Sequence, residues 1–200
     1  MNRNSQKLLL KEGTTQELKI ITSTRIPKDF FVTTGVGESD ITVHAGSYHL
    51  ALKEAGIERC NIMTYSSILS GIATEIPKPP QDKLVHGSVL ETIMANSTAK
   101  KGERATAGII FGWLFDKNTG KKHGGLVCEY NGSGTEEECA DSLRKSLREM
   151  YENGYSDQFR MKDIKIIEKS FVPKKKYGSA LVALCFVNYV FPVLGITGQN

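Results

Sequence analysis

The sequence predicts an α+β sandwich fold, because most of its regular segments have the composition of β-strands and only two have the periodicity of a helix. The strand-like segments are rich in β-branched and aromatic residues, which fit the half-buried surface of a sheet. One helical segment lies early in the chain and the other late, an order that indicates an α+β sandwich. The length of 200 residues fits one domain with a sizeable core.

The first half of the chain contains two predicted strands, at 30–34 and 60–64, and one predicted helix. The first strand should end at Gly35-Val-Gly37, which lacks the third glycine of a dinucleotide-binding loop. The helix is expected at 47–55, and Gly56 can end it. Its apolar positions, which share one face, are Tyr48, Ala51, Leu52 and Ala55.

From residue 84 onward the sequence is mostly strand-like. The predicted strands are 85–95, 106–115, 125–130, 164–171 and 180–189. The second helix should begin at Thr135-Glu-Glu-Glu138, which has the pattern of a capping box, and end near Gly154. Leu143, Leu147 and Met150 should form its inner face.

Composition and charge exclude several classes of function. The 40% hydrophobic and 24% charged residues are typical of a globular protein. The net charge of +4 includes one basic run, Lys174–Lys176, with no interleaved aromatic residue, so no nucleic-acid partner is expected. Neither the four cysteines nor the four histidines have the spacing of metal ligands, so no metal site is expected.

Both ends of the chain bear on its expected location. The N-terminal Met1–Lys7 has no signal-peptide character, so the cytoplasm is the expected compartment. The apolar stretch 180–196 is shorter than a membrane span and is interrupted by Asn188, Pro192 and Gly195. We therefore expect a buried strand followed by a tail, and no membrane partner.

The most informative stretch is Asn61-Ile-Met-Thr-Tyr-Ser-Ser-Ile-Leu69, which places two adjacent serines at the exit of a predicted strand. Such a pair usually marks only a strand that turns into a loop. It can also be a self-cleavage site, because the Ser67 hydroxyl can attack the Ser66 carbonyl and convert the peptide to an ester. β-Elimination and hydrolysis then leave a pyruvoyl group, a ketone that can form a Schiff base with a substrate amine.

Three blocks of sequence together resemble the pyruvoyl-dependent arginine decarboxylase family. They are Gly35-Val-Gly-Glu-Ser39, the segment in which Ser67 follows Asn61 by six residues, and Gly124-Gly-Leu-Val-Cys-Glu-Tyr130. The resemblance extends from about Ile26 to about Val190. It implies decarboxylation of L-arginine to agmatine and CO₂ by a covalent pyruvoyl cofactor derived from Ser67.

The same resemblance implies the architecture of the protein. The family fold is a four-layer αββα sandwich, self-cleaved here into a β chain, 1–66, and an α chain, 67–200. The subunits should form a trimer, or a hexamer of paired trimers, with active sites between neighbouring subunits. Residues 26–200 would be the decarboxylase domain and residues 1–25 an N-terminal extension of unassigned role.

Two further residues acquire candidate roles. Asn61 is the expected donor to the oxyanion of the self-cleavage step, and the alternative is an amide that binds backbone at a strand end.

Strand alternation places Glu129 on the face of Val127, opposite Leu126 and Cys128. Burial there should raise the pKa of Glu129, as a general acid that reprotonates the substrate carbon requires. The alternative is a surface glutamate before the turn at Asn131.

Substrate recognition is where the sequence departs from the family. A guanidinium group requires a carboxylate, and the family usually supplies one from the helix before the cleaved strand, where this chain has His49. An imidazole cannot neutralise a cation and repels it when protonated. Either Glu38, Asp40 or Glu58 binds the guanidinium, or the substrate is another amino acid. An uncleaved, non-catalytic homologue is the remaining alternative.

Overall fold

The computed structural model describes residues 19–197. Most of the N-terminal extension predicted for residues 1–25, including Leu8–Leu10, therefore lies outside the described residues. Residues 26–189 form the main body of the protein. In a second unit, strands β1 (Lys19–Thr22) and β13 (Val193–Thr197) pair with each other in antiparallel orientation.

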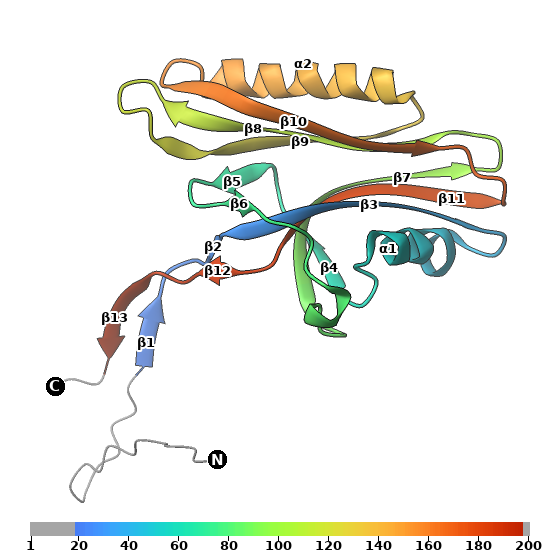
Figure 1. Ribbon diagram of the computed structural model, residues 1–200, viewed down its shortest axis with the longest axis horizontal. Helices are drawn as coiled ribbons and strands as arrows, with labels where there is room; N and C mark the ends of the chain where they lie inside the picture. The colour runs from blue at the N-terminus through green and yellow to red at the C-terminus, as the bar shows by residue number, and fades with distance from the viewer. Residues whose placement is uncertain (1–18, 198–200) are drawn as a thin grey trace, which may run out of the picture. The chain divides into compact units, whose positions relative to one another are not determined.

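The main body consists of two facing sheets, each covered by a helix on its outer face (Figure 1). Helix α1 (His49–Ala55) packs on the five-stranded sheet and helix α2 (Glu136–Gly154) on the four-stranded sheet. The body is thus a mixed α/β structure that is mostly sheet, as the sequence predicts.

The five-stranded sheet has strands from distant parts of the sequence at its centre. Its order is β4 (Asn61–Thr64), β7 (Val89–Lys100), β11 (Tyr177–Phe186), β3 (Asp29–Ser39) and β6 (Thr74–Glu75). The three central strands are antiparallel, whereas each short edge strand runs parallel to its neighbour. Because β11 is buried along almost its whole length, the apolar stretch that begins at Ala180 is the centre of a sheet.

The four-stranded sheet is entirely antiparallel. Its order is β10 (Phe159–Phe171), β8 (Ala105–Asp116), β9 (Lys122–Gly132) and β5 (Ile68–Ser70). The predicted capping box starts the helix on this sheet: Glu138 N donates to Thr135 Oγ1 at 3.2 Å, and Thr135 N donates to Glu138 Oε2 at 2.8 Å. Leu143 and Leu147 are buried on the inner face of the helix, as expected.

Four short elements complete the described chain. They are β2 (Ile26–Pro27), a π-helix (Val43–Tyr48) that leads directly into α1, a 3₁₀-helix (Gln81–Lys83) and β12 (Tyr189–Val190). Among residues 19–197, no helix is both long and apolar enough to cross a membrane.

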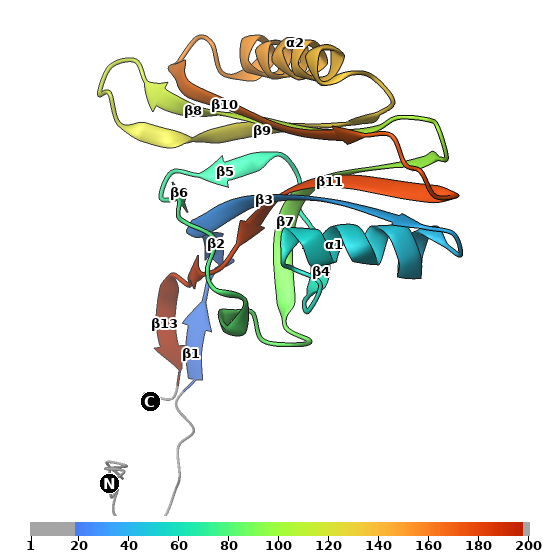
Figure 2. The same cartoon turned by 45° about the vertical axis from the view of Figure 1, so that its right-hand side comes forward.

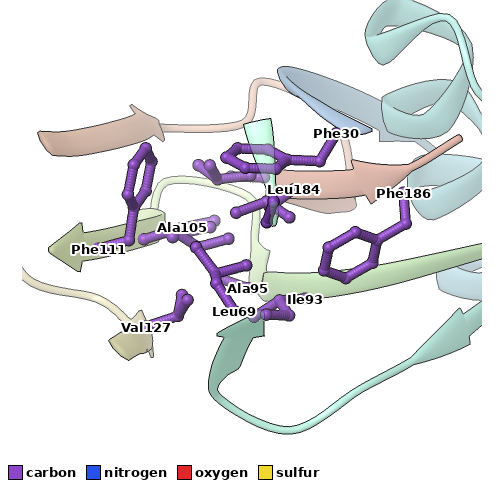
Figure 3. Close-up of a cluster of buried hydrophobic side chains, with 14 residues drawn as sticks. Phe30, Leu69, Ile93, Ala95, Ala105, Phe111, Val127, Leu184 and Phe186 are labelled. Atoms are coloured by element: carbon purple, nitrogen blue, oxygen red, sulfur yellow. The ribbon is translucent and has the colours of Figure 1, made fainter. Parts of the chain in front are cut away.

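The layer between the two sheets is the main hydrophobic core (Figure 3). Phe30 from β3 makes edge-on contacts with Phe111 from β8 and Phe186 from β11, at centroid distances of 5.9 and 6.2 Å. Leu69 and Val127 enter the same core from β5 and β9. Tyr65, which precedes the Ser66–Ser67 bond, and Leu69, which follows it, both pack in this core.

The predicted end of the first strand at Gly35 is wrong, because β3 continues through both glycines to Ser39. The glycines are required by the helix that lies against the strand. A Cβ atom on Gly35 would lie 2.1 Å from the Ala51 carbonyl oxygen, and one on Gly37 would lie 2.2 Å from the Ser47 carbonyl oxygen. Glycine here serves close packing of helix on strand and does not form a turn.

Candidate active site

The Ser66–Ser67 bond lies where the chain passes from one sheet to the other (Figure 2). On the upstream side, Tyr65 N donates to the Thr92 carbonyl oxygen at 2.7 Å, which extends the pairing of β4 with β7. On the downstream side, Val127 N donates to the Ser67 carbonyl oxygen at 2.9 Å, which ties Ser67 to β9. Ser66 therefore connects two residues that are each fixed to a different sheet.

The carbonyl of this bond has a backbone donor. Ile68 N donates to the Ser66 carbonyl oxygen at 3.1 Å, the hydrogen bond of a three-residue turn centred on Ser67. Ser66 is exposed and Ser67 is half-buried. The turn therefore holds the bond at the surface with its carbonyl oxygen already polarised by an N–H group.

Glu129 contacts the Ser67 side chain. The Ser67 hydroxyl donates to Glu129 Oε2 at 3.4 Å, which is long for a hydroxyl–carboxylate contact. Burial raises the pKa of Glu129, and the hydrogen bond from Ser67 partly opposes that shift. Both the raised pKa and the strand alternation agree with the prediction: Val127 faces the core between the sheets, whereas Leu126 and Cys128 face α2.

Asn61 is placed differently from the other two candidates. It begins β4, and its Nδ2 donates to the Gly87 carbonyl oxygen at 2.9 Å. With a rise of about 3.3 Å per residue, roughly 13 Å of strand separate it from Tyr65. Within one chain, Asn61 therefore binds backbone at a strand end, which is the alternative given above. Its role in self-cleavage stays a prediction.

His49 is exposed at the start of α1, and this end of the helix lies beside Gly37 of β3. The cleavage bond lies at the level of Thr92 on β7. Thr92 pairs with Cys185, and Cys185 pairs with Phe31 of β3, which is six residues before Gly37. Along the strand direction, His49 is thus about 20 Å from that level.

Glu38 and Asp40 bind the basic turn at that distant end of the sheet. Glu38 Oε2 accepts hydrogen bonds from the backbone N–H groups of Lys174 and Lys175 at 2.7 and 3.2 Å. Asp40 Oδ1 accepts one from Lys176 N at 3.1 Å. Both carboxylates therefore fix the backbone of the turn at 174–176 in their own chain.

Glu58 is the candidate acid with a spare acceptor. Its Oε1 accepts a hydrogen bond from Gln81 Nε2 at 2.7 Å and lies 3.8 Å from Arg59 Nε. Its Oε2 is buried and has no hydrogen-bond partner within the described residues. Because Glu58 precedes β4, it lies beyond Asn61 from the cleavage bond, so one chain does not bring it beside Ser67.

Two residues of the site were missed by sequence reasoning. The Tyr65 hydroxyl donates a hydrogen bond to Glu91 Oε2, and Glu91 is only 3% exposed. The available signal was a carboxylate inside the apolar strand segment 89–95, on the same face as Ile93 and Ala95. Its partner Tyr65 could not be read from the sequence, because it lies 26 residues away, just after the end of β4.

The remaining candidate groups are the possible metal ligands and the cysteine thiols of the described residues. Within residues 19–197, no three His, Cys, Asp or Glu side chains cluster as metal ligands would. The four cysteines are free, and burial raises the pKa of the Cys128 and Cys139 thiols to about 11. Such thiols stay protonated near neutrality and are poor nucleophiles.

Comparison with known proteins gives consistent matches along this body. The family model described as pyruvoyl-dependent arginine decarboxylase matches residues 29–191. The pyruvoyl-dependent arginine decarboxylase AaxB of Chlamydia abortus is 33% identical over 192 residues, covering 83% of this chain and 93% of that protein. The pyruvoyl-dependent arginine decarboxylase of Methanococcus vannielii is 31% identical over 127 residues, covering 63% of this chain and 72% of that protein.

The likeness to solved structures is weaker. A pyruvoyl-dependent histidine decarboxylase structure at pH 8 aligns with 56% of this chain and 53% of its own, with a TM-score of 0.36 and 17% sequence identity. The family of this chain is therefore shown by the sequence matches and not by this structural alignment.

Proposed function

The chain belongs to the pyruvoyl-dependent arginine decarboxylase family, and on that premise we propose that it splits itself between Ser66 and Ser67 and decarboxylates L-arginine to agmatine and CO₂. The observation that carries the proposal is the arrangement at one turn. A nucleophilic hydroxyl, a buried carboxyl group and an N–H donor on the preceding carbonyl meet there.

Self-cleavage begins when Ser67 Oγ bonds to the Ser66 carbonyl carbon. The C–N bond breaks, and the hydroxyl proton passes to the Ser67 nitrogen, which leaves an ester. Residue 67 then loses its Cα proton while the Cβ–Oγ bond breaks, so that Ser66 leaves with a new carboxylate. Water replaces the nitrogen, ammonia departs, and a ketone remains on residue 67.

The backbone N–H of Ile68 supports the first of these steps. The Ser66 carbonyl oxygen becomes negatively charged while its carbon is tetrahedral, and Ile68 N already donates to it at 3.1 Å. A donor fixed before the reaction stabilises that charge without reorganisation. We propose this N–H group as an oxyanion donor within one chain, beside the role predicted for Asn61.

The residues around Ser67 fit a pyruvoyl group. Position 67 is half-buried, its own carbonyl is held by Val127 N, and a carboxyl with a raised pKa contacts its side-chain oxygen. When formed, the group would supply a ketone that condenses with the substrate amine. It would then accept the electrons of the bond between the substrate α-carbon and its carboxylate, which breaks to release CO₂.

Glu129 then serves as the proton donor to the substrate carbon. Burial raises the pKa of this carboxyl, which increases its protonated fraction near neutral pH. Val127, two residues earlier on the same face of β9, is fully buried, and Glu129 itself is half-buried. A proton held on Glu129 lies beside position 67, where the substrate carbon would be bound.

For the guanidinium group we propose a binding site that is shared between two copies of the chain. Glu58 and His49 both lie far from their own Ser67, so a neighbouring subunit would bring them to it. Exposed apolar residues flank the cleavage bond, with Met63 and Ile68 each 51% exposed and Ile72 45% exposed. These exposed side chains support an interface between subunits at this place, and we propose a homotrimer or hexamer with active sites between subunits. The proposed location of the enzyme is the cytoplasm.

A second candidate is the same chemistry on a different amino acid. It is favoured by His49, which stands where the family usually has an acid. Release of CO₂ from a panel of amino acids distinguishes the two functions. Negligible release from L-arginine, together with release from a neutral or acidic amino acid, would replace arginine as the substrate.

Mass spectrometry of the purified protein tests the proposal itself. A splitting chain gives two fragments separated at 66/67, and the larger one gains mass with a hydrazine that traps ketones. A single chain of 22.1 kDa that persists through long incubation and never reacts with the hydrazine would instead indicate an uncleaved, non-catalytic homologue.

A further inference from the structure

We infer that Tyr65 and Glu91 form a positioning pair that holds the Ser66–Ser67 bond in the geometry required for self-cleavage. The inference rests on the proposed function and adds residues to it. The role that we infer for both side chains is exerted through the backbone that they fix. The pair governs how often the Ser67 hydroxyl meets the Ser66 carbonyl carbon.

Tyr65 is fixed in three independent ways. Its backbone N–H donates to Thr92 O at 2.7 Å. Its ring packs against Phe186 at a centroid distance of 5.7 Å and joins the core between the sheets. Its hydroxyl donates to Glu91 Oε2. A residue held at its backbone, ring and tip has little freedom to rotate, and the next residue along the chain is Ser66.

Glu91 is unusual for its surroundings. It is 3% exposed and lies on the face of β7 that carries Ile93 and Ala95 into the apolar core. A buried carboxylate is costly unless it is paired and hydrogen-bonded. In the parallel pairing of β4 with β7, Glu91 is opposite Met63, which places the acid within reach of the Tyr65 side chain.

The pair matters because the cleavage bond connects two sheets. Val127 N holds Ser67 to the four-stranded sheet, and Tyr65 is the matching anchor on the five-stranded sheet. The acyl shift needs Ser67 Oγ against the Ser66 carbonyl carbon, and small errors in such a geometry cost large factors in rate. Loosening one anchor should therefore slow the shift while both sheets remain folded.

Three variants test this role. Tyr65→Phe keeps the ring against Phe186 and removes the hydroxyl, Glu91→Gln keeps an acceptor oxygen without its charge, and the third combines both changes. Freshly synthesised protein is followed by intact mass as the full-length chain disappears. We expect splitting to slow by about tenfold or more in Tyr65→Phe, less in Glu91→Gln, and no further in the double variant than in Tyr65→Phe.

Tyr151→Phe is the matched control. It also removes a tyrosine hydroxyl that donates a hydrogen bond, here to the Phe159 carbonyl oxygen at 2.8 Å, but it lies on α2. It should lower the melting temperature about as much as Tyr65→Phe and still split at the wild-type rate. Equal slowing in Tyr151→Phe would show a general loss of stability and overturn the inference.

Hydroxylamine identifies the step that is slowed. It cleaves esters, so it accelerates splitting only if a step after formation of the ester limits the rate. Variants of the pair should respond to it no more than the wild type, because their delay precedes the ester. Rapid splitting of Tyr65→Phe in hydroxylamine would place the pair after the acyl shift and overturn the inference.

The wild type separates the two proposals. If it never splits, the proposed function fails. If it splits and all three variants split at its rate, only the positioning role fails. Should Tyr65→Phe not fold, Glu91→Gln decides alone, with slowed splitting expected and an unchanged rate overturning the inference.

Discussion

Val127 donates its backbone N–H to the Ser67 carbonyl oxygen at 2.9 Å, and the same strand carries Glu129 two residues later. The residue that would be cleaved and the acid that would serve it are therefore held by one segment of β9. This shared attachment to β9 keeps the Ser67 hydroxyl and the Glu129 carboxyl within 3.4 Å of each other at a surface turn.

Replacing the proposed nucleophile should abolish splitting. Ser67→Ala removes the hydroxyl that attacks the Ser66 carbonyl, so the chain should remain at 22.1 kDa by intact mass. Ser66→Ala is the control, because it keeps the Ser67 hydroxyl and the carbonyl under attack, and it should still split. Fragments separated at 66/67 in Ser67→Ala would show that another group breaks the chain.

Neutralising the proposed proton donor should reduce turnover. Glu129→Gln cannot return a proton to the substrate carbon, so kcat for CO₂ release should fall about 10²- to 10⁴-fold when measured on fully split protein. Glu149→Gln changes an exposed glutamate on α2 and should leave kcat unaltered. A kcat near that of the wild type in Glu129→Gln would assign the proton to another group.

The pH dependence of turnover follows from the pKa of Glu129. Burial raises this pKa above its usual value, and the proposed role requires the protonated form. kcat should therefore be highest below the raised pKa and fall as pH rises through it. A pH–rate profile measures this alkaline limb, and the limb should vanish from the residual activity of Glu129→Gln. A limb that persists unchanged in that variant would belong to a different group.

Helix packing on β3 can be tested through its glycines. Gly35→Ala places a methyl group 2.1 Å from the Ala51 carbonyl oxygen, a backbone atom that cannot turn aside. The free energy of unfolding should drop by roughly 1–3 kcal/mol or more in denaturant titrations. Gly154→Ala, at the end of α2 where a Cβ meets open space, should be neutral or slightly stabilising. Equal stability of the two variants would mean that α1 can move away from the strand.

Local patterns in the sequence predicted much of the fold. Period-2 alternation placed Glu129 on the same face of its strand as Val127, which enters the core between the sheets, and the pattern from Thr135 to Glu138 located the start of α2. Both features depend on residues close together in the chain. The two adjacent serines were likewise predicted at the exit of a strand, and they follow the end of β4 at Thr64.

Features that depend on distant contacts were not predicted. The continuation of β3 through Gly35 follows from a helix that lies against it, and a glycine pair carries no sign of that neighbour. The hydrogen bond between Tyr65 and Glu91 joins two residues that are 26 positions apart in the sequence. The distance of His49 from the cleavage bond follows from the direction of α1 along β3, which helical periodicity does not specify.

The order of strands in the five-stranded sheet determines what a cut between residues 66 and 67 can release. Two strands of that sheet, β3 and β4, precede the cut, whereas β6, β7 and β11 follow it, and β3 lies between β11 and β6. The two polypeptides would stay interleaved, with ten residue pairs joining β3 to β11 at the centre of the sheet. Fragment dissociation would require global unfolding, so a nicked protomer should behave in solution as one particle with an extra pair of chain ends.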